Sequence, residues 1–403
     1  MKISAIISEY NPFHNGHRYL IEKVRENGAS HIISIMGGNF LQRGNCAIAD
    51  KYERAKAAVK GGVDVVLELP AVYACSSSER FALGAVGTLE GCGCVDELAL
   101  GSECGNIKLL GNAAEIISQN NDVERLCREL KKQGLSHPRA MEQAVRKAAA
   151  AMGDDSISDV LKNPNNTLAV EYIKALHSLK SNIQPFTTTR IGAAHDSEIT
   201  DNRFASASAI REMILKNDNT YSLFVPKATR EILSQCIENG ECPSQFKNNE
   251  RGLLSILRQM TACDFARIPD VGEGLENRIV KAVHENNTVS EIITAVKCKA
   301  YTHARLSRII TCAYLGITKE TASIAPEYIR VLAFNGKGTE ILKTMKKTAS
   351  LPIVMSPAKD ISKLGEKGRK LIETDLCASD LYGLLTPDIQ GCGKDYYKGA
   401  VRI

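Results

Sequence analysis

Two histidines three residues apart, His14 and His17, stand on what we expect to be an exposed turn near the start of the chain. The turn follows an apolar run at residues 2–8 and precedes residues 16–27, which have helical spacing. A helix N-terminus offers free N–H groups and a positive dipole end, which suits phosphate. If His17 lies in the first helical turn, both imidazoles can donate hydrogen bonds to charge on one phosphoryl oxygen. Gly16, without a side chain, would let a flat base approach the backbone. The alternative is two surface histidines on a loop.

Alternating strands and helices must position this turn. Strands are predicted at residues 2–8, 31–36, 63–69 and 95–100, and helices at 16–27, 50–61 and 76–90. Asp50 is the expected N-cap of the second helix. This order predicts a parallel sheet with helices on both faces, in which ligands bind beyond the carboxyl ends of the strands.

The remainder of the chain is mainly helical. Helices fill residues 105–180 apart from a break at 163–166. A strand at 184–191 and a short helix at 206–215 are expected to rejoin the first sheet, which makes about 110–180 a helical insertion. From about residue 220 the pattern is helical again, with short strand-like runs at 330–334 and 351–355. We therefore expect one part at 1–218 and a second, mainly helical part at 219–403.

Composition fits a soluble globular protein, with 44% apolar and 24% charged residues. No apolar run is long enough for a membrane span, and the N-terminus is too short and too polar for a signal peptide. The thirteen cysteines form no regular framework, so reduced thiols in a cytoplasm are expected. Cys92 and Cys94 are the closest pair, and no zinc-binding spacing occurs, so no metal site is predicted.

Positive charge is concentrated between Lys297 and Lys347. This segment has ten Lys or Arg residues against three acids, a net charge of +7, so the rest of the chain carries −2 of the total +5. Such a concentration is typical of binding to a polyanion. A solvated helix face with ordinary lysines is the alternative.

The pattern HxGH after a first strand resembles the nucleotidylyltransferase superfamily, which includes the class I aminoacyl-tRNA synthetases. The resemblance implies a Rossmann-like domain and attack on the α-phosphate of ATP. A second signature resembles residues 206–211, where Ser206 and Ser208 would hold the β- and γ-phosphates. Ala205 and Ala209 depart from it, since many relatives have Ile and Thr there.

Longer blocks narrow the resemblance to the bacterial tRNA(Met) cytidine acetate ligase family. They are SEYNPFHNGH, MGGNFLQRGNCAIADKYERAKAA, GVDVVLELP, ALGSE, NPNNTLAVEY, RIGAAHD and KCKAYTHARLSR, from residue 3 to about 310. The family's reaction joins acetate and ATP into acetyl-adenylate and pyrophosphate, and then moves the acetyl group to N4 of the wobble cytidine of elongator tRNA(Met). ATP, accompanied by Mg²⁺, would be a substrate, and no tightly bound cofactor, coenzyme A or membrane would take part.

The resemblance also implies the site residues. His14 and His17 would be catalytic. The ATP-binding residues would be Ile7, Ser8, Glu9, Tyr10, Asn11, Pro12, Phe13, His14, Asn15, Gly16, His17, Arg18, Tyr19, Leu20, Gly101, Asn165, Arg190 and Ile191. Gly101 follows the fourth strand at the carboxyl edge, where it is either a nucleotide contact or a plain turn glycine. Arg190 ends a strand at the same edge, where a guanidinium fork suits phosphate.

Three further groups of residues stay open. The glycine-rich loop 36–44 follows the second strand, and its Arg43 and the nearby Lys51 would meet a carboxylate, a tRNA phosphate or only solvent. Cys46 is an acyl-carrier candidate without an obvious means of lowering its pKa except Arg43. Lys299, Arg305 and Arg308 are the predicted tRNA contacts. Tyr301 or His303 would stack on an unpaired base, and the alternative for Tyr301 is a place at the edge of the core.

Two other functions compete with the ligase. An ordinary nucleotidylyltransferase that makes a small coenzyme precursor would share the HxGH turn, but it has no use for a basic, helical C-terminal half. A non-catalytic RNA-binding protein with a relict nucleotide site is the second alternative. The intact His14, Gly16 and His17 disfavour it.

Overall fold

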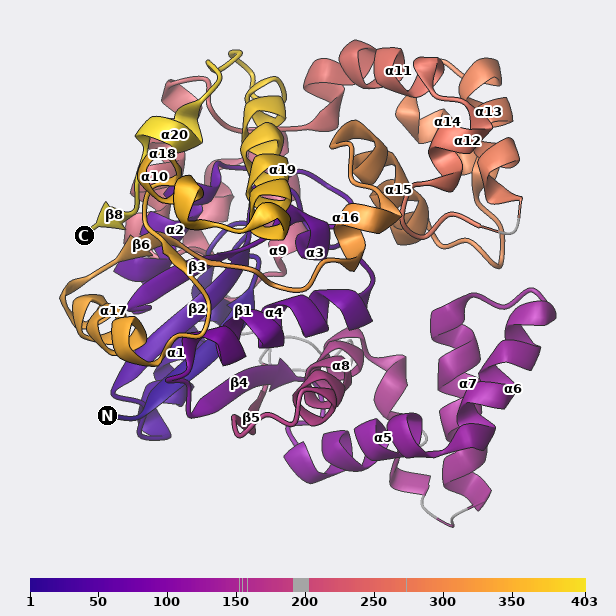
Figure 1. Cartoon of the computed structure of the whole chain (residues 1–403), viewed down its shortest axis with the longest axis horizontal. Coiled ribbons are helices and arrows are strands. Elements are labelled where there is room, and N and C mark those ends of the chain that lie inside the picture. Colours follow the sequence, from indigo (N-terminus) through magenta and orange to yellow (C-terminus); the bar gives the residue numbers. More distant parts are fainter. Residues whose placement is uncertain (152, 154, 158, 191–202, 273) are drawn as a thin grey trace.

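The computed structural model describes residues 1–403 except 152, 154, 158, 191–202 and 273. One sheet organises the molecule, with strand order β5-β4-β1-β2-β3-β6-β7 and with β8 paired to β6 (Figure 1). Its parallel part consists of β1 (Ile3–Ser8), β2 (His31–Gly37), β3 (Val65–Leu69), β4 (Glu97–Ser102) and β5 (Gln184–Thr189). The carboxyl ends of these strands therefore share one edge, where ligands of open α/β sheets bind.

Side-chain alternation along the strands divides the core between two faces of the sheet. Ile33 and Ile35 of β2 join the apolar cluster that includes α4 (Ser78–Cys92) and α8 (Pro164–Ser178). Ile32 and Met36 join the cluster of α1 (Asn15–Glu26) and α2 (Lys51–Lys60). Because successive strand residues point to opposite faces, a single strand supplies both cores. The prediction of helices on both faces is confirmed.

The predicted N-terminal elements form within about two residues of their expected bounds. Asp50 caps α2 as predicted, and its carboxylate accepts from the Tyr52 N–H at 2.9 Å. The fourth strand begins two residues later than expected, at Glu97. The preceding helix runs to Cys92, and Gly93, at φ 64°, ends it in the left-handed conformation, so the chain needs residues 93–96 to turn. Pro70 ends β3 and caps a short helix, α3 (Ala71–Ala74).

The sheet also contains strands from the C-terminal part of the chain. They are β6 (Ile329–Phe334), β7 (Ile353–Val354) and β8 (Val401–Arg402). Because β6 runs antiparallel to β3, the sheet is mixed rather than wholly parallel. Strands from both sides of the predicted boundary at residue 218 thus share one sheet, and the boundary itself stays a prediction.

Two groups of helices extend from the sheet on the same side of Figure 1. The first, within the predicted insertion, comprises α5 (Ile107–Gln119), α6 (Asn121–Lys132) and α7 (His137–Ala151). The second comprises α11 (Glu250–Gln259), α12 (Ala262–Ala266), α13 (Leu275–Glu285), α14 (Val289–Val296) and α15 (His303–Tyr314). The other helices pack nearer the sheet and are α9 (Ala207–Leu215), α10 (Lys227–Glu238), α16 (Lys319–Ser323), α17 (Gly336–Thr348), α18 (Pro357–Asp360), α19 (Glu366–Gly383) and α20 (Lys394–Tyr397).

Candidate active site

The turn between β1 and α1 holds the two histidines against each other. His14 is the N-cap of α1, and its Nδ1 accepts from the Gly16 N–H at 3.0 Å. The His14 N–H in turn donates to Nδ1 of His17 at 3.2 Å, and the two rings stack with centroids 3.7 Å apart. This is a capping box built from two imidazoles, in which each ring uses one nitrogen to close the helix start.

The hydrogen bonds of this capping box determine the tautomers. A ring nitrogen that accepts a hydrogen bond carries no proton, so in each neutral ring the proton lies on Nε2. Burial, with Arg190 and Arg211, lowers the pKa of His14 to about 3. Burial, with His14 and Arg190, also lowers the pKa of His17 well below its usual value. Both rings are therefore neutral near pH 7, and each keeps one Nε2–H as a donor for a phosphoryl oxygen.

One expectation about this turn is wrong. His14 does not lie on an exposed turn, since only 6% of its surface is accessible. The approach of a base to Gly16 stays a prediction. A Cβ at Gly16 would lie 2.9 Å from Cε1 of His14, so a side chain there would meet the ring of His14. The glycine allows the histidine to fold back over its own helix start.

We predict that neither histidine titrates between pH 8 and pH 5 in the folded protein. The unfolded pKa is about 6.5. On acidification the unfolded chain therefore takes up protons first, and the stability present above pH ~6.5 is lost as the pH falls toward the folded values. Nitrogen-15 NMR of the imidazoles should show Nδ1 unprotonated and Nε2 protonated throughout this range. An ordinary titration with a midpoint near 6.5 would contradict the assignment.

A cavity of about 620 Å³ opens beside the histidine turn, at the carboxyl edge of the sheet. It brings together most of the predicted site residues that are far apart in sequence. Its lining comprises His14, Gly16, His17, Tyr19, Leu20, Gly101, Glu103, Lys162, Asn163, Pro164, Asn165, Thr188, Thr189, Arg190, Phe204, Ala205 and Ser206. Asn165 reaches it from the first turn of α8 rather than from an isolated polar turn. Ile191, also predicted, lies outside the described residues.

A smaller, mainly apolar hollow of about 80 Å³ adjoins this cavity and shares five of its residues. The predicted Ile7 and Ser8 line it. Ala99, Leu168, Ala169 and Tyr172 also line it, and sequence reasoning did not select them. Glu103 and Phe204 of the larger cavity were missed as well. The available signal for Glu103 was its position two residues after Gly101, directly after the end of β4.

The other residues of the predicted stretch 7–20 support the turn or face away from the cavity. Tyr10 and Phe13 are core residues, exposed by 1% and 0%. Arg18 pairs with Glu22 on the outer face of α1. The side chains of Glu9, Asn11 and Asn15 form hydrogen bonds with neighbouring loops. Pro12 is buried. Direct ATP contacts by these residues stay a prediction.

The second predicted phosphate segment lies against the first. Ser206 is the N-cap of α9, and its Oγ accepts from the Ala209 N–H at 3.1 Å. Ser208 accepts from Arg211 at 3.0 Å, and Arg211 also donates to the Asn11 carbonyl oxygen at 2.8 Å. Because Arg211 connects α9 to the histidine turn, the N-termini of α1 and α9 meet at one end of the cavity.

Lys51 and Cys46 have no place at the cavity. Lys51 is only 1% exposed, and its Nζ lies 2.7 Å from both Glu68 and Asp395, so its ammonium group is buried between two carboxylates and does not face solvent. Arg330 contacts the same two acids, each at 3.2 Å. Cys46 donates to the Ser244 carbonyl oxygen, and burial raises the pKa of its thiol to about 12. A protonated, buried thiol does not support an acyl-carrier role.

Arg43, by contrast, is exposed. Burial, and to a smaller extent Arg43, lowers the pKa of Arg211. Arg43 is therefore close enough to the histidine turn for its charge to be felt there. Its role as a contact for a carboxylate or a tRNA phosphate remains a prediction.

The predicted basic segment does not form one surface. Arg305 donates to the Asp270 carbonyl oxygen at 2.7 Å, and Arg308 pairs with the Asp270 carboxylate at 3.0 Å, so both tie α15 to a neighbouring loop. Lys299 is exposed. The lysines between 337 and 347 belong to α17, which lies at the left of Figure 1, whereas α15 lies at the right. Lys319 lies in α16 and Arg330 in β6, so the net charge of +7 is spread over several elements rather than gathered on one surface.

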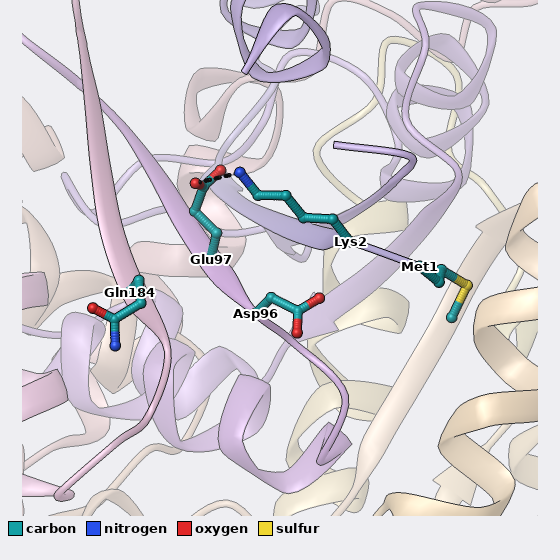
Figure 2. Close-up of a pocket in the computed structure, with 5 residues that line it drawn as sticks. All are labelled: Met1, Lys2, Asp96, Glu97 and Gln184. Carbon is teal, nitrogen blue, oxygen red and sulfur yellow. Dashed lines mark ion pairs between the residues drawn. The ribbon is translucent and has the colours of Figure 1, made fainter. Parts of the chain in front are cut away.

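An open hollow of about 510 Å³ lies at the opposite edge of the sheet (Figure 2). Lys2 and Glu97 pair across it at 2.8 Å, and the Asp96 carboxylate accepts from the Ile3 N–H at 2.7 Å. The side-chain charges of Lys2, Asp96 and Glu97 therefore have partners within the chain.

All thirteen cysteines are free thiols. Across the described residues, no group of three or more His, Cys, Asp or Glu side chains is arranged to hold a metal ion. In the same part of the chain, no helix combines the length and apolar character needed to cross a bilayer.

Comparisons with known proteins identify the family of this chain. The HIGH Nucleotidyl Transferase family model matches residues 1–395. A tRNA(Met) cytidine acetate ligase of Caldanaerobacter subterraneus subsp. tengcongensis is 38% identical over 408 residues, which span 100% of both chains. The protein of the same name from Clostridium kluyveri is 39% identical over 416 residues, 100% of this chain and 99% of the relative.

Two crystal structures of Thermotoga maritima TmcAL share the fold over the full length of both chains, at 33% identity. The structure bound with alpha-thio ATP has a TM-score of 0.93, and the apo structure has a TM-score of 0.94. The α/β fold and the resemblance drawn from the sequence blocks are thereby confirmed. This chain belongs to the HIGH nucleotidyl transferase family and, within it, to the tRNA(Met) cytidine acetate ligases.

Proposed function

We propose that the chain activates acetate with ATP and acetylates N4 of the wobble cytidine of elongator tRNA(Met). In the first step an acetate oxygen bonds to the α-phosphorus and the bond to the β-phosphate oxygen breaks, which yields acetyl-adenylate and pyrophosphate. In the second step the cytidine N4 attacks the acetyl carbonyl carbon, AMP leaves, and N4 loses one proton. The products are N4-acetylcytidine, AMP and pyrophosphate.

The observation that carries this proposal is the pair of neutral histidines at one end of the cavity. Their Nε2–H groups, together with the N-termini of α1 and α9, supply donors where negative charge develops on a phosphoryl group. Neutral donors suit this task, because they keep their protons through the reaction. The rest of the catalysis is positioning, since acetate needs only to be held in line with the departing pyrophosphate.

The names of the full-length relatives favour this reaction over the synthesis of a small coenzyme precursor. Mg²⁺ is proposed to enter with ATP. This ion is commonly bound through substrate phosphates with few protein ligands.

The direct test is a labelled-acetate experiment. We expect label from acetate to appear in N4-acetylcytidine of tRNA(Met) only when ATP is present, as measured by nucleoside mass spectrometry. Pyrophosphate should form from ATP and acetate without tRNA, because the first step precedes tRNA attack. Transfer of label from acetyl-coenzyme A in the absence of ATP would contradict the proposed acyl source.

A second test concerns tRNA binding. Replacing Lys297 and Lys299 with alanine should weaken tRNA binding. It should also reduce the slope of the log binding constant against log salt concentration, by about 0.7–0.9 for each lost phosphate contact. Both lysines are exposed, whereas Arg305 and Arg308 also hold the Asp270 loop, so the lysine pair is the cleaner variant.

The matched control replaces two exposed lysines of α17, Lys343 and Lys347. Filter binding across a salt series compares the two variants, and pyrophosphate release should survive in both. Equal losses in both variants would mean that binding depends on overall charge rather than on this segment. Unchanged binding in the first would mean that Lys297 and Lys299 belong to a solvated face.

A further inference from the structure

The groups that line the cavity differ in charge along its length: Lys162 and Arg190 are cations, Glu103 is an anion, and the charge of Arg190 acts on both histidines and on Glu103. At one end stand His14, His17 and Ser206, with the N-termini of α1 and α9 behind them. At the other end the Glu103 carboxylate covers the N-terminus of α8. A carboxylate repels phosphate, whereas a helix N-terminus attracts it. The triphosphate of a bound nucleotide therefore belongs at the histidine end, and its nucleoside belongs near Glu103 and Asn165.

Glu103 is clamped by hydrogen bonds from both directions. Its Oε2 accepts from the Asn166 N–H at 2.7 Å, and its Oε1 accepts from Nδ2 of Asn165 at 2.6 Å and from the Asn165 N–H at 3.2 Å. In return, Oδ1 of Asn166, a residue that is 1% exposed, accepts from the N–H groups of Glu103 and Cys104 at 2.9 and 3.1 Å. Reciprocal hydrogen bonds thus join the turn after β4 to the start of α8.

This clamp determines which atom of Asn165 faces the ligand. An asparagine amide has a donor side and an acceptor side, and the donor side is held by Glu103. Oδ1 receives no hydrogen bond from any residue that the structure describes, and Asn165 lines both the cavity and the adjoining apolar hollow. We propose that Glu103 is a positioning residue that orients Asn165 as a hydrogen-bond acceptor and thereby selects nucleotides with a matching donor on the nucleoside.

The inference rests on the proposed function, because it takes the cavity to be the ATP site. Two donors of adenosine have the required chemistry, the 6-amino group of adenine and a ribose hydroxyl. Inosine triphosphate lacks the amino group, and 2′- and 3′-deoxy-ATP each lack one hydroxyl. A ligand without the donor leaves Oδ1 unpaired, so the wild-type protein should bind one of these analogues about tenfold less tightly than ATP.

The test replaces Glu103 with glutamine, which has nearly the same shape but presents an N–H donor where the carboxylate had an acceptor. The Asn165 amide then loses its partner and is free to turn. In E103Q we expect the dissociation constant for ATP, from calorimetry, to rise about tenfold. The ratio of the dissociation constant for the rejected analogue to that for ATP should fall to near one. The maximal rate of pyrophosphate release at saturating ATP should change little.

Three further variants separate positioning from a merely structural role. N165A should lose the same preference, and E103Q/N165A should behave like N165A alone, because the two residues act through one contact. In E103D the shorter carboxylate can still accept from the Asn166 N–H, and we expect the same loss of nucleotide preference. This variant replaces E103Q if E103Q does not fold. The matched control is N106A, which removes the nearby N-cap of α5 without touching the cavity. It should lower the melting temperature and leave nucleotide preference intact.

The outcomes are distinct. A wild-type protein that binds no ATP would overturn the proposed function itself. Wild-type binding of ATP with an analogue preference that E103Q and E103D both retain would overturn the positioning role of Glu103. An equal loss of preference in N106A would show that the effect arises from general loosening of the fold. The positioning role is supported if the Glu103 variants lose the preference, N106A keeps it, and E103Q/N165A loses no more than N165A. The analogue that the wild-type protein rejects then identifies the donor on the nucleoside.

Discussion

Replacing either His14 or His17 with alanine is expected to slow pyrophosphate release from ATP and acetate by about a hundredfold or more. Each substitution removes one preoriented Nε2–H from the point where charge develops on a phosphoryl oxygen, and losing one such donor typically has this effect. Because the two rings stack and the backbone N–H of His14 donates to Nδ1 of His17, we expect the double variant to be little slower than either single variant. A coupled assay for pyrophosphate, run at saturating ATP and acetate, measures the effect.

The same substitutions also remove part of the capping box of α1, which should cost about 1 kcal/mol of stability. Two controls separate this cost from the loss of catalysis. T288A removes the equivalent box at α14, away from the cavity, and should cost as much stability with no loss of rate. H14N keeps a good N-cap acceptor but moves the donor, so stability should recover and the rate should not. A near wild-type rate in H14A or H17A would contradict the role given to the histidines.

Replacing Lys51 with methionine is expected to lower the free energy of unfolding by about 3–5 kcal/mol. The lysine is buried between Glu68 and Asp395, and its loss leaves two carboxylates with Arg330 as their remaining close cation. Removing one partner of a buried charge network leaves an uncompensated charge, which accounts for a cost of this size. Asp395 lies in α20, so the same change should loosen the C-terminal segment.

Urea denaturation followed by circular dichroism measures this change, with R18A as the control. Arg18 pairs with Glu22 at the surface, where the loss should stay below about 1 kcal/mol. If K51M also lowers the free energy of unfolding by less than about 1 kcal/mol, Lys51, Glu68, Asp395 and Arg330 do not form a buried network of charged groups. Such a result would reopen the possibility that Lys51 contacts a substrate.

Local sequence patterns were sufficient to predict the framework of the site. The apolar runs at β1, β2 and β3 alternate with helices, and this order alone places the HxGH turn at the carboxyl edge of a sheet. Asp50 at the start of α2 and Ser206 at the start of α9 were predictable for the same reason, since an N-cap depends on residues two or three positions away. The residues Gly101, Asn165 and Arg190 line one cavity with His14 and His17, although their role as ATP ligands was drawn from family resemblance.

Tertiary structure alone decided the charge and partners of these residues. The lowered pKa of His14 and His17, and hence their neutral state, depends on burial and on arginines about 180–200 residues away, which no local pattern contains. Lys51 resembles a surface lysine in sequence, but its partner Asp395 is 344 positions distant and reaches it only when β6 joins the sheet beside β3. The basic segment 297–347 looks continuous along the chain and is divided in space between α15 and α17. Helix and strand periods report which face of an element is buried, whereas the identity of a buried polar group's partner depends on chain packing over hundreds of residues.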